Sequence, residues 1–370
     1  MMLPHPPFFL FGMGNRRKFL YKSGVLYDAM TGDMLRSWKP IHEHIIPHEY
    51  TVKWQTREGK TYTIREDETG VCLMVEGTQT WLTGNPLQLP DFKGGGPGEP
   101  FGNSHAHILK VLLHEVLVNI VDGKPLANFL VRDAPAYRDA TIICEALRRT
   151  GNLGLVKDWI LSLAEPFDLA RQGEREPDNL GQALYLISMV SDREHPLVAR
   201  ILEQADAFRR TDYLAGRTDG AEHPVYQTKW FKFGLKSLGL PDDFHIPVSF
   251  DSYAPVFWMD YRDVSNGGPP FTEKLKESNP SLAWAEAHFH GWDPPMHVAA
   301  KNYPLSWEQH SEGDPPYGMS LVAPEFVDRR IAAPQARHAA EMLLYFLDHA
   351  QPGFRDHGHH GRDEHFLHAH

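Results

Sequence analysis

The sequence has few cysteines and no long apolar run. Its 370 residues include two cysteines, Cys72 and Cys144, which supply neither a zinc-ligand spacing nor a disulfide framework. No segment reaches the roughly 18 to 20 apolar residues that a membrane span needs. The apolar run at Phe8–Phe11 lacks the basic flank and the cleavage site of a signal peptide. We therefore expect a cytoplasmic protein that does not contact a membrane, and the sequence predicts no particular oligomeric state.

The sequence also lacks basic blocks and the common cofactor and hydrolase motifs. It has 37 basic and 48 acidic residues, for a net charge of −11, and no long Lys/Arg segment, so we expect no nucleic-acid partner. The glycine run after Lys93 is not followed by the Gly-Lys-Ser/Thr of a P-loop, and the nucleophile-elbow, dinucleotide and zincin patterns are missing. His-x-His pairs such as His288 and His290 have no third ligand at diagnostic spacing. We expect no cofactor and no bound metal.

The periodicity of the apolar residues divides the chain into regions. Residues 8–90 alternate with period two between turn residues, which predicts a small antiparallel sheet within an N-terminal β region, 1–100, with a hairpin around the turn Glu58-Gly59-Lys60. From residue 104 the period becomes about 3.6, which is typical of amphipathic helices. The predicted helices cover about 104–122, 136–150, 153–164, 179–191, 196–209, 222–238 and 335–349. A loop-rich insertion, 241–333, interrupts this helical region, 104–350, and a His-rich tail, 351–370, is expected to be mobile.

Two acids stand at the start of predicted helices. Asp139 shares a helical face with Ile143 and Leu147, so its carboxylate is expected to point inward. Asp178 directly precedes an amphipathic helix, with Glu176 two residues before it. Dipole pairing or a buried ion pair would also explain Asp139, and helix capping alone would explain Asp178. The functional interpretation is that crowded carboxylates supply a general acid with a raised pKa.

The loop-rich insertion places further acids beside aromatic rings. Asp260 follows Trp258, Glu286 follows Trp284, and Trp307 lies further along. Aromatic faces can cover sugar rings, although core packing is the alternative for each tryptophan. Because glycoside hydrolysis uses two carboxyl groups across the scissile bond, we expect Asp260 and Glu286 to be further catalytic candidates.

Three segments carry a family resemblance. Tyr137-Arg138-Asp139-Ala140, the segment Glu176–Gln182 and Arg337–Met342 resemble parts of the six-hairpin, (α/α)6-toroid glycosidases. The resemblance covers about residues 104–350. It implies a mainly α fold, an (α/α) toroid with a small N-terminal antiparallel β region. It also implies that an Arg-Asp pair opening an inner helix contacts the sugar and that a late helix closes the ring.

Together these features predict a carbohydrate-active enzyme, with a glycoside hydrolase as the first expectation. Asp139, Asp178, Asp260 and Glu286 are the catalytic candidates. The residues expected to contact the carbohydrate are Tyr137, Arg138, Glu176, Gln182, Trp258, Trp284 and Trp307. Two alternatives stay open: a sugar epimerase or polysaccharide lyase that uses a His or Tyr base, and a non-enzymatic scaffold that binds glycans.

Overall fold

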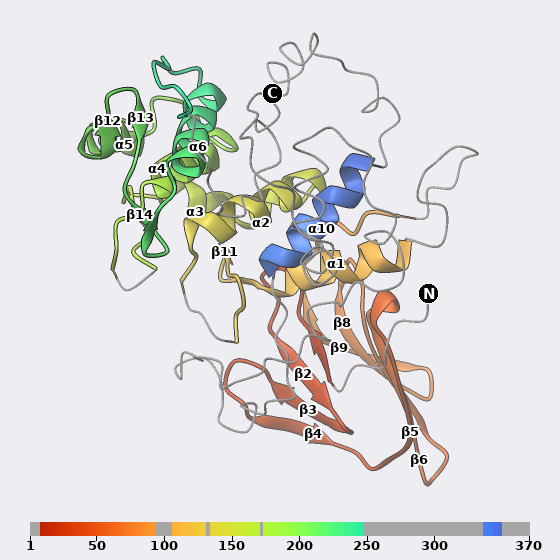
Figure 1. Cartoon of the computed structure of the whole chain (residues 1–370). Helices are drawn as coiled ribbons and strands as arrows, with labels where there is room; N and C mark the ends of the chain where they lie inside the picture. Colours follow the sequence, from red (N-terminus) through yellow and green to blue (C-terminus); the bar gives the residue numbers. More distant parts are fainter. Residues whose placement is uncertain (1–7, 93–105, 131–133, 171–172, 248–335, 350–370) are drawn as a thin grey trace.

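Two antiparallel sheets form the N-terminal part of the protein (Figure 1). The structure is a computed structural model, and it describes residues 8–92, 106–130, 134–170, 173–247 and 336–349. The first sheet contains β1 (Phe9–Phe11), β2 (Phe19–Lys22), β3 (Val25–Asp28) and β4 (Met34–Ser37). The second contains β5 (Pro40–Ile46), β6 (Thr51–Thr56), β7 (Thr61–Glu66), β8 (Gly70–Val75) and β9 (Thr78–Gly84), with a short 3-10 helix, η1 (Pro47–Glu49), between β5 and β6. The alternating pattern thus predicted the antiparallel pairing of this region correctly, but it predicted one small sheet where the structure has two.

The two sheets share one apolar core. Phe11 and Tyr21 of the first sheet are fully buried against Trp54 and Ile64 of the second. The hairpin predicted around Glu58-Gly59-Lys60 is confirmed, because β6 pairs with β7 on either side of that turn. Every second residue of these strands faces the other sheet, which is what period-two alternation encodes.

The helical part follows the sheets in the chain and lies beside them in Figure 1. Its helices are α1 (Ala106–Val118), α2 (Tyr137–Arg149), α3 (Lys157–Leu161), α4 (Asp178–Ser188), α5 (Pro196–Ala205), α6 (Pro224–Ser237) and α10 (Ala336–His349). Two 3-10 helices, η2 (Leu153–Leu155) and η3 (Asp206–Phe208), adjoin α3 and α5. Most predicted helices are confirmed within a few residues, whereas the one expected over 153–164 is only the short η2 and α3.

Short hairpins separate several of these helices. They are formed by β10 (Ile120–Val121) with β11 (Lys124–Pro125), β12 (Arg209–Arg210) with β13 (Tyr213–Leu214), and β14 (Arg217–Thr218) with β15 (Ala221–Glu222). The helix α10, far along the chain, packs against α1 and α2 (Figure 1). This contact brings the start of α10 close to the start of α2.

The helices α4 and α6 touch almost backbone to backbone. A Cβ atom on Gly181 would lie 2.2 Å from the main-chain carbonyl of Trp230, and one on Gly234 would lie 2.6 Å from the Gly181 oxygen. Glycine at these two positions permits the close approach. As a result, the first turn of α4 lies against the middle of α6.

The predicted (α/α) toroid and the mainly α fold class are wrong. The described residues form seven α-helices and 15 strands in five sheets, which is a mixed α and β architecture. The physical reason is that a period of 3.6 specifies that a helix forms but not how helices are arranged. Here β-hairpins stand between α1 and α2 and between α5 and α6, where a ring built of helices alone would have none.

No helix in the described ranges combines the length and the apolar character that crossing a membrane requires. The predicted insertion lies mostly outside these ranges, as does the His-rich tail.

Candidate functional site

Arg138 is the centre of a buried charged network at the start of α2. Its guanidinium donates to Asp178 at 3.1 Å, to Glu176 at 2.9 Å and to Asp219 at 2.8 Å. The side chains of Arg138, Glu176 and Asp178 are at most 6% exposed. One guanidinium thus faces three carboxylates, so this group, the Arg138 cluster, carries an excess of negative charge.

Asp178 is held on both of its carboxylate oxygens. Oδ2 accepts from Gln182 at 2.8 Å as well as from Arg138, and Oδ1 accepts from the Thr218 hydroxyl at 2.8 Å. The side chain is completely buried. A carboxylate that accepts this many hydrogen bonds has little capacity left for a ligand, and its evident effect is to connect α4 with α2 and the β14–β15 hairpin.

Asp219 reaches the network from a tight turn. It forms the two-residue loop between β14 and β15 together with Gly220, and both residues have positive φ, 50° and 81°. An Asp-Gly pair in such a loop is typical of a type I′ hairpin turn. The turn also directs the Asp219 N–H to Glu176, at 2.6 Å.

Two carboxyl groups near Arg138 have raised pKa values. Burial raises the pKa of Glu176, although the Asp219 N–H and Arg138 oppose this shift. Burial also raises the pKa of Asp168, which accepts the Tyr137 N–H at 2.6 Å and so caps α2 in place of a residue at the usual N-cap position. Raised carboxyl pKa values next to a charged cluster are a feature of functional sites, and also of structural ion-pair networks.

A second group of charges lies at the edge of this network, where α10 meets α2. Arg337 of α10 donates to Glu341 at 2.9 Å and approaches Asp139 of α2 at 3.5 Å. The side chains of Arg337 and Asp139 are 21% and 19% exposed, whereas that of Glu341 is 1% exposed. The Glu341 Oε2 atom is buried and has no hydrogen-bond partner among the described residues. We call Asp139, Arg337 and Glu341 the edge triad.

Gln182 and Tyr226 connect the Arg138 cluster with the edge triad. Gln182 donates to Asp178 and, at 3.4 Å, to the Tyr226 hydroxyl. Burial alone would lower the pKa of the Arg337 guanidinium, but Glu341, Asp139 and Tyr226 together raise this pKa by more, so the net shift is upward. Tyr226 therefore lies within electrostatic range of Arg337. Hydrogen bonds therefore link the Arg138 cluster to Tyr226, and an electrostatic interaction links Tyr226 to Arg337 of the edge triad. We call the residues linked in this way the polar layer.

The structure places six of the residues predicted from the sequence. Arg138, Glu176 and Asp178 meet in the Arg138 cluster, Gln182 donates to Asp178 from beside it, and Asp139 lies in the edge triad. Tyr137 is buried and its hydroxyl donates to the Glu165 carbonyl at 2.6 Å. The remaining candidates lie outside the described residues: Asp260, Glu286, Trp258, Trp284 and Trp307. Their roles stay predictions.

Sequence reasoning missed several members of this layer. Asp219 could have been found as a hairpin turn from its Asp-Gly pair, but nothing in the sequence pairs it with Arg138. Arg337 and Glu341 lie in the segment Arg337–Met342, which carried the family resemblance, but neither residue was predicted to belong to the site. Tyr226 is an ordinary helical aromatic residue by its spacing. Among the residues that the structure describes, no group of three or more metal-ligating side chains is present.

Comparisons with family models, with curated proteins and with solved structures find no match for this chain. The resemblance to six-hairpin glycosidases is therefore wrong. The three short motifs that carried it are explained by local structure instead: an ion pair, a helix start, and an Arg-Glu pair one turn apart on α10.

Proposed function

We propose that the protein is a carbohydrate-active enzyme whose reacting groups gather at the edge triad. The observation that carries this proposal is the contrast in exposure within one polar layer. Arg138, Glu176 and Asp178 are buried and engaged with one another, whereas Asp139 and Arg337 are about one-fifth exposed, as is Asp219 at the far side of the Arg138 cluster. A ligand that approaches this layer from solvent meets a carboxylate and a guanidinium first.

The charge of the layer favours a neutral, hydroxyl-rich ligand. Five carboxylates, those of Asp139, Glu176, Asp178, Asp219 and Glu341, surround two guanidinium groups. This excess of negative charge repels phosphates and carboxylates. Hydroxyl groups can donate to Asp139 and accept from Arg337 at once, and a small number of placed polar groups of this kind gives a ligand site its specificity.

Within this proposal Asp139 is the residue that moves a proton. It lies in the first turn of α2 and is the most exposed carboxylate of the edge triad. Arg337 orients Asp139 and Glu341 by binding both, and so gives the site two carboxylates on one guanidinium. Paired carboxylates are the arrangement that acid–base chemistry at sugars uses.

The Arg138 cluster acts on Asp139 through the backbone. Arg138 is the neighbour of Asp139, and its guanidinium ties the first turn of α2 to α4 and to the β14–β15 turn. A residue whose neighbour is held by three ion pairs has few alternative positions. In this assignment Arg138 and Asp178 are positioning residues, and Asp139 is the catalytic residue.

The test is a screen of neutral mono- and oligosaccharides with wild type and Asp139→Asn. Saturation-transfer NMR reports binding, and mass spectrometry of the products reports turnover. We expect Asp139→Asn to lower turnover by about 100-fold or more, because loss of a general acid or base costs about that much. Folding should be little affected, because the Asp139–Arg337 contact is long, at 3.5 Å, and Arg337 keeps its closer pair with Glu341 at 2.9 Å.

The matched control is Asp158→Asn, which removes an exposed acid from the first turn of another helix, α3. This variant should keep wild-type turnover. Products with added water would mean hydrolysis, unsaturated products would mean elimination, and products of unchanged mass would mean epimerisation. Binding without turnover would favour the glycan-binding scaffold, and turnover that survives in Asp139→Asn would remove Asp139 from the proposal.

A further inference from the structure

The strand β9 forms one edge of the second sheet and lies beside β8 (Figure 1). Its sequence, Thr-Gln-Thr-Trp-Leu-Thr-Gly, contains no charged residue and no proline. The stretch from Thr78 to Trp81 is exposed throughout, and Trp81 itself is 46% exposed. An exposed, uncharged edge strand is a template for pairing with another strand, because its outward N–H and C=O groups lack partners.

The hairpin between β8 and β9 shows which main-chain groups point outward. Residues 76–77 form a two-residue turn with positive φ, and Val75 pairs with Thr78 on either side of it. The pair that closes such a turn is hydrogen-bonded, and hydrogen-bonded and open pairs then alternate along the ladder. Gln79 and Trp81 therefore direct their N–H and C=O groups away from β8, and these groups have no other main-chain partner within the described ranges.

The other edges of the two large sheets carry features that block such pairing. β1 has only three residues, and all of them are buried. β4 carries Arg36 and a bulge, and β5 contains Pro40, Glu43 and a bulge. Charges, proline and bulges are the devices by which natural sheets protect their edges. β9 also has a bulge, at Leu82, but it follows the regular stretch Thr78–Trp81 and leaves that stretch free to pair.

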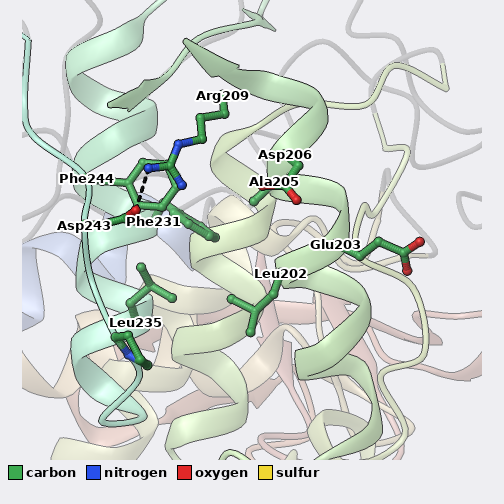
Figure 2. Close-up of a pocket in the computed structure, with 10 residues that line it drawn as sticks. Leu202, Glu203, Ala205, Asp206, Arg209, Phe231, Leu235, Asp243 and Phe244 are labelled. Atoms are coloured by element: carbon green, nitrogen blue, oxygen red, sulfur yellow. Dashed lines mark hydrogen bonds and ion pairs between the residues drawn. The ribbon is translucent and has the colours of Figure 1, made fainter. Parts of the chain in front are cut away.

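A second copy of the chain matches this edge better than a foreign peptide does. Peptides that add to a sheet edge are selected by pockets for their alternate side chains. The hollow shown in Figure 2 is lined by α5, α6 and the segments after them, and β9 does not contribute to it. Two identical antiparallel strands related by a two-fold axis present the same main-chain pattern to each other. Because β9 is uncharged, no like charges meet across that axis, although the whole chain carries a net charge of −11.

We propose that two copies of the chain associate through β9 and form one continuous sheet across a two-fold axis. The outward main-chain groups fix the register. Gln79 of each copy pairs with Trp81 of the other through hydrogen bonds, and the two Thr80 residues face each other at the axis. The two Trp81 rings then lie diagonally on one face of the sheet, within reach of each other. This interface shares no residue with the edge triad or the Arg138 cluster, so it is independent of the proposed function.

Sedimentation velocity of the wild-type chain from about 2 to about 200 μM measures the association. A contact between two short strands is smaller than a standard interface, so we expect a reversible dimer with a dissociation constant of about 10 to 100 μM. A chain that stays monomeric over this range would overturn the proposal. Open-ended assemblies in place of a dimer would also overturn it, because pairing about a two-fold axis closes on itself.

Variants at the two-fold position separate this contact from any other. Thr80→Lys places two like charges opposite each other and should weaken association by about tenfold or more. Thr80→Glu should have the same effect for the same reason. An equimolar mixture of the two variants should dimerise again, because opposite charges then meet at the axis. The matched control is Ser37→Lys, which adds the same charge to the exposed edge strand β4 and should associate like wild type.

The mixture also distinguishes a lost contact from a lost fold, because misfolded chains would not regain a defined dimer. Circular dichroism should show an unchanged sheet in each variant, since residue 80 is exposed. Unchanged association of Thr80→Lys, a mixture that stays monomeric, or an equal loss of association in Ser37→Lys would each contradict pairing through β9.

Discussion

Two buried arginines, Arg16 in the β-rich region and Arg138 in the helical region, are surrounded in different ways. Arg16 pairs with one carboxylate, Glu66, at 2.9 Å, and also donates to three main-chain carbonyls, those of Asn85, Asp67 and Glu68. Both side chains of the Arg16–Glu66 pair are fully buried. A second buried cation, Lys18, lies within electrostatic range of Glu66 and Arg16, and both cations donate to main-chain carbonyls, so they bind backbone segments to one another.

Arg138 instead gathers side-chain carboxylates. Its partners are Glu176, Asp178 and Asp219, which come from the segment before α4, from α4 itself and from a hairpin turn. Negative charge is in excess, and the cluster continues through polar residues to the partly exposed Asp139 and Arg337. The comparison teaches that burial of an ion pair does not define its role. Cations bound mainly to main-chain carbonyls are explained by folding alone, whereas a network of charged side chains that extends to the surface is a feature that functional sites share.

The largest effect is expected from removing the centre of the helical cluster. Arg138→Met would leave Glu176 and Asp178 buried without their cation, and we expect a loss of about 3 to 5 kcal/mol in the free energy of unfolding. Urea denaturation at neutral pH measures it. Arg193→Met is the control, because the Arg193–Glu194 pair is 64% and 84% exposed and should contribute less than about 1 kcal/mol. Equal losses in the two variants would contradict the central place given to Arg138.

A pH effect of nearly the same size is expected where the β-rich region meets α1. His114 of α1 is buried, with Nε2 2.8 Å from the Leu10 carbonyl oxygen, and burial lowers its pKa to about 4. An unfolded histidine has a pKa of about 6.5, so between these values the unfolded state binds more protons and stability rises with pH. The His114 contribution to this rise is about 3 kcal/mol.

The measurement is the unfolding free energy of wild type and His114→Gln at about pH 4.5 and about pH 7, which bracket most of that transition. The glutamine amide can still donate to the Leu10 carbonyl but does not titrate. Wild type should lose more stability than the variant as the pH falls. Parallel losses would show that His114 is not the group that titrates.

A smaller effect contrasts the two clusters directly. Glu66→Gln removes the single carboxylate of Arg16 and disturbs the bonds from the Gly12 and Met13 N–H groups, so we expect a loss of about 2 kcal/mol. Glu176→Gln removes one of the three carboxylates that face a single guanidinium, and the loss in the free energy of unfolding should be below about 1 kcal/mol.

The two substitutions also differ in their pH dependence. Because burial raises the pKa of Glu176, the folded state favours its protonated form, and wild type should lose stability relative to Glu176→Gln as the pH rises through that pKa. Chemical denaturation across the acidic range measures this difference. If Glu176→Gln cost as much as Glu66→Gln at every pH, the two clusters would be equivalent and the comparison would fail.

The sequence predicted local structure well in both regions. Alternation around Glu58-Gly59-Lys60 identified the β6–β7 hairpin, and the amphipathic pattern identified α2 and α4 to within three residues. The toroid was wrong because its motifs describe helix starts that many architectures share. Nothing in the periodicity shows that Gly181 and Gly234 allow α4 and α6 to touch, or that α10 returns to pack on α1 and α2.

The site was predicted only in part, because its local features can be read from the sequence whereas its contacts between distant segments cannot. Asp139 and Asp178 were recognised because each stands in the first turn of an amphipathic helix, a local feature. Their different environments were not predictable, because Asp178 is enclosed by Thr218 and Gln182 whereas Asp139 faces Arg337. The contact with Arg337 joins residues 198 positions apart in the chain, a separation that no local pattern encodes.

The measurement that tests the account most directly is a pair of titrations at the edge triad. Wild type and Asp139→Asn would be titrated with the best-binding neutral monosaccharide from the screen and with its phosphate ester. Because carboxylates outnumber guanidinium groups in this layer, the account predicts that the ester binds about tenfold more weakly to wild type, and that Asp139→Asn weakens the neutral sugar and narrows the difference. Tighter binding of the phosphate ester to wild type, with no change in Asp139→Asn, would contradict the account.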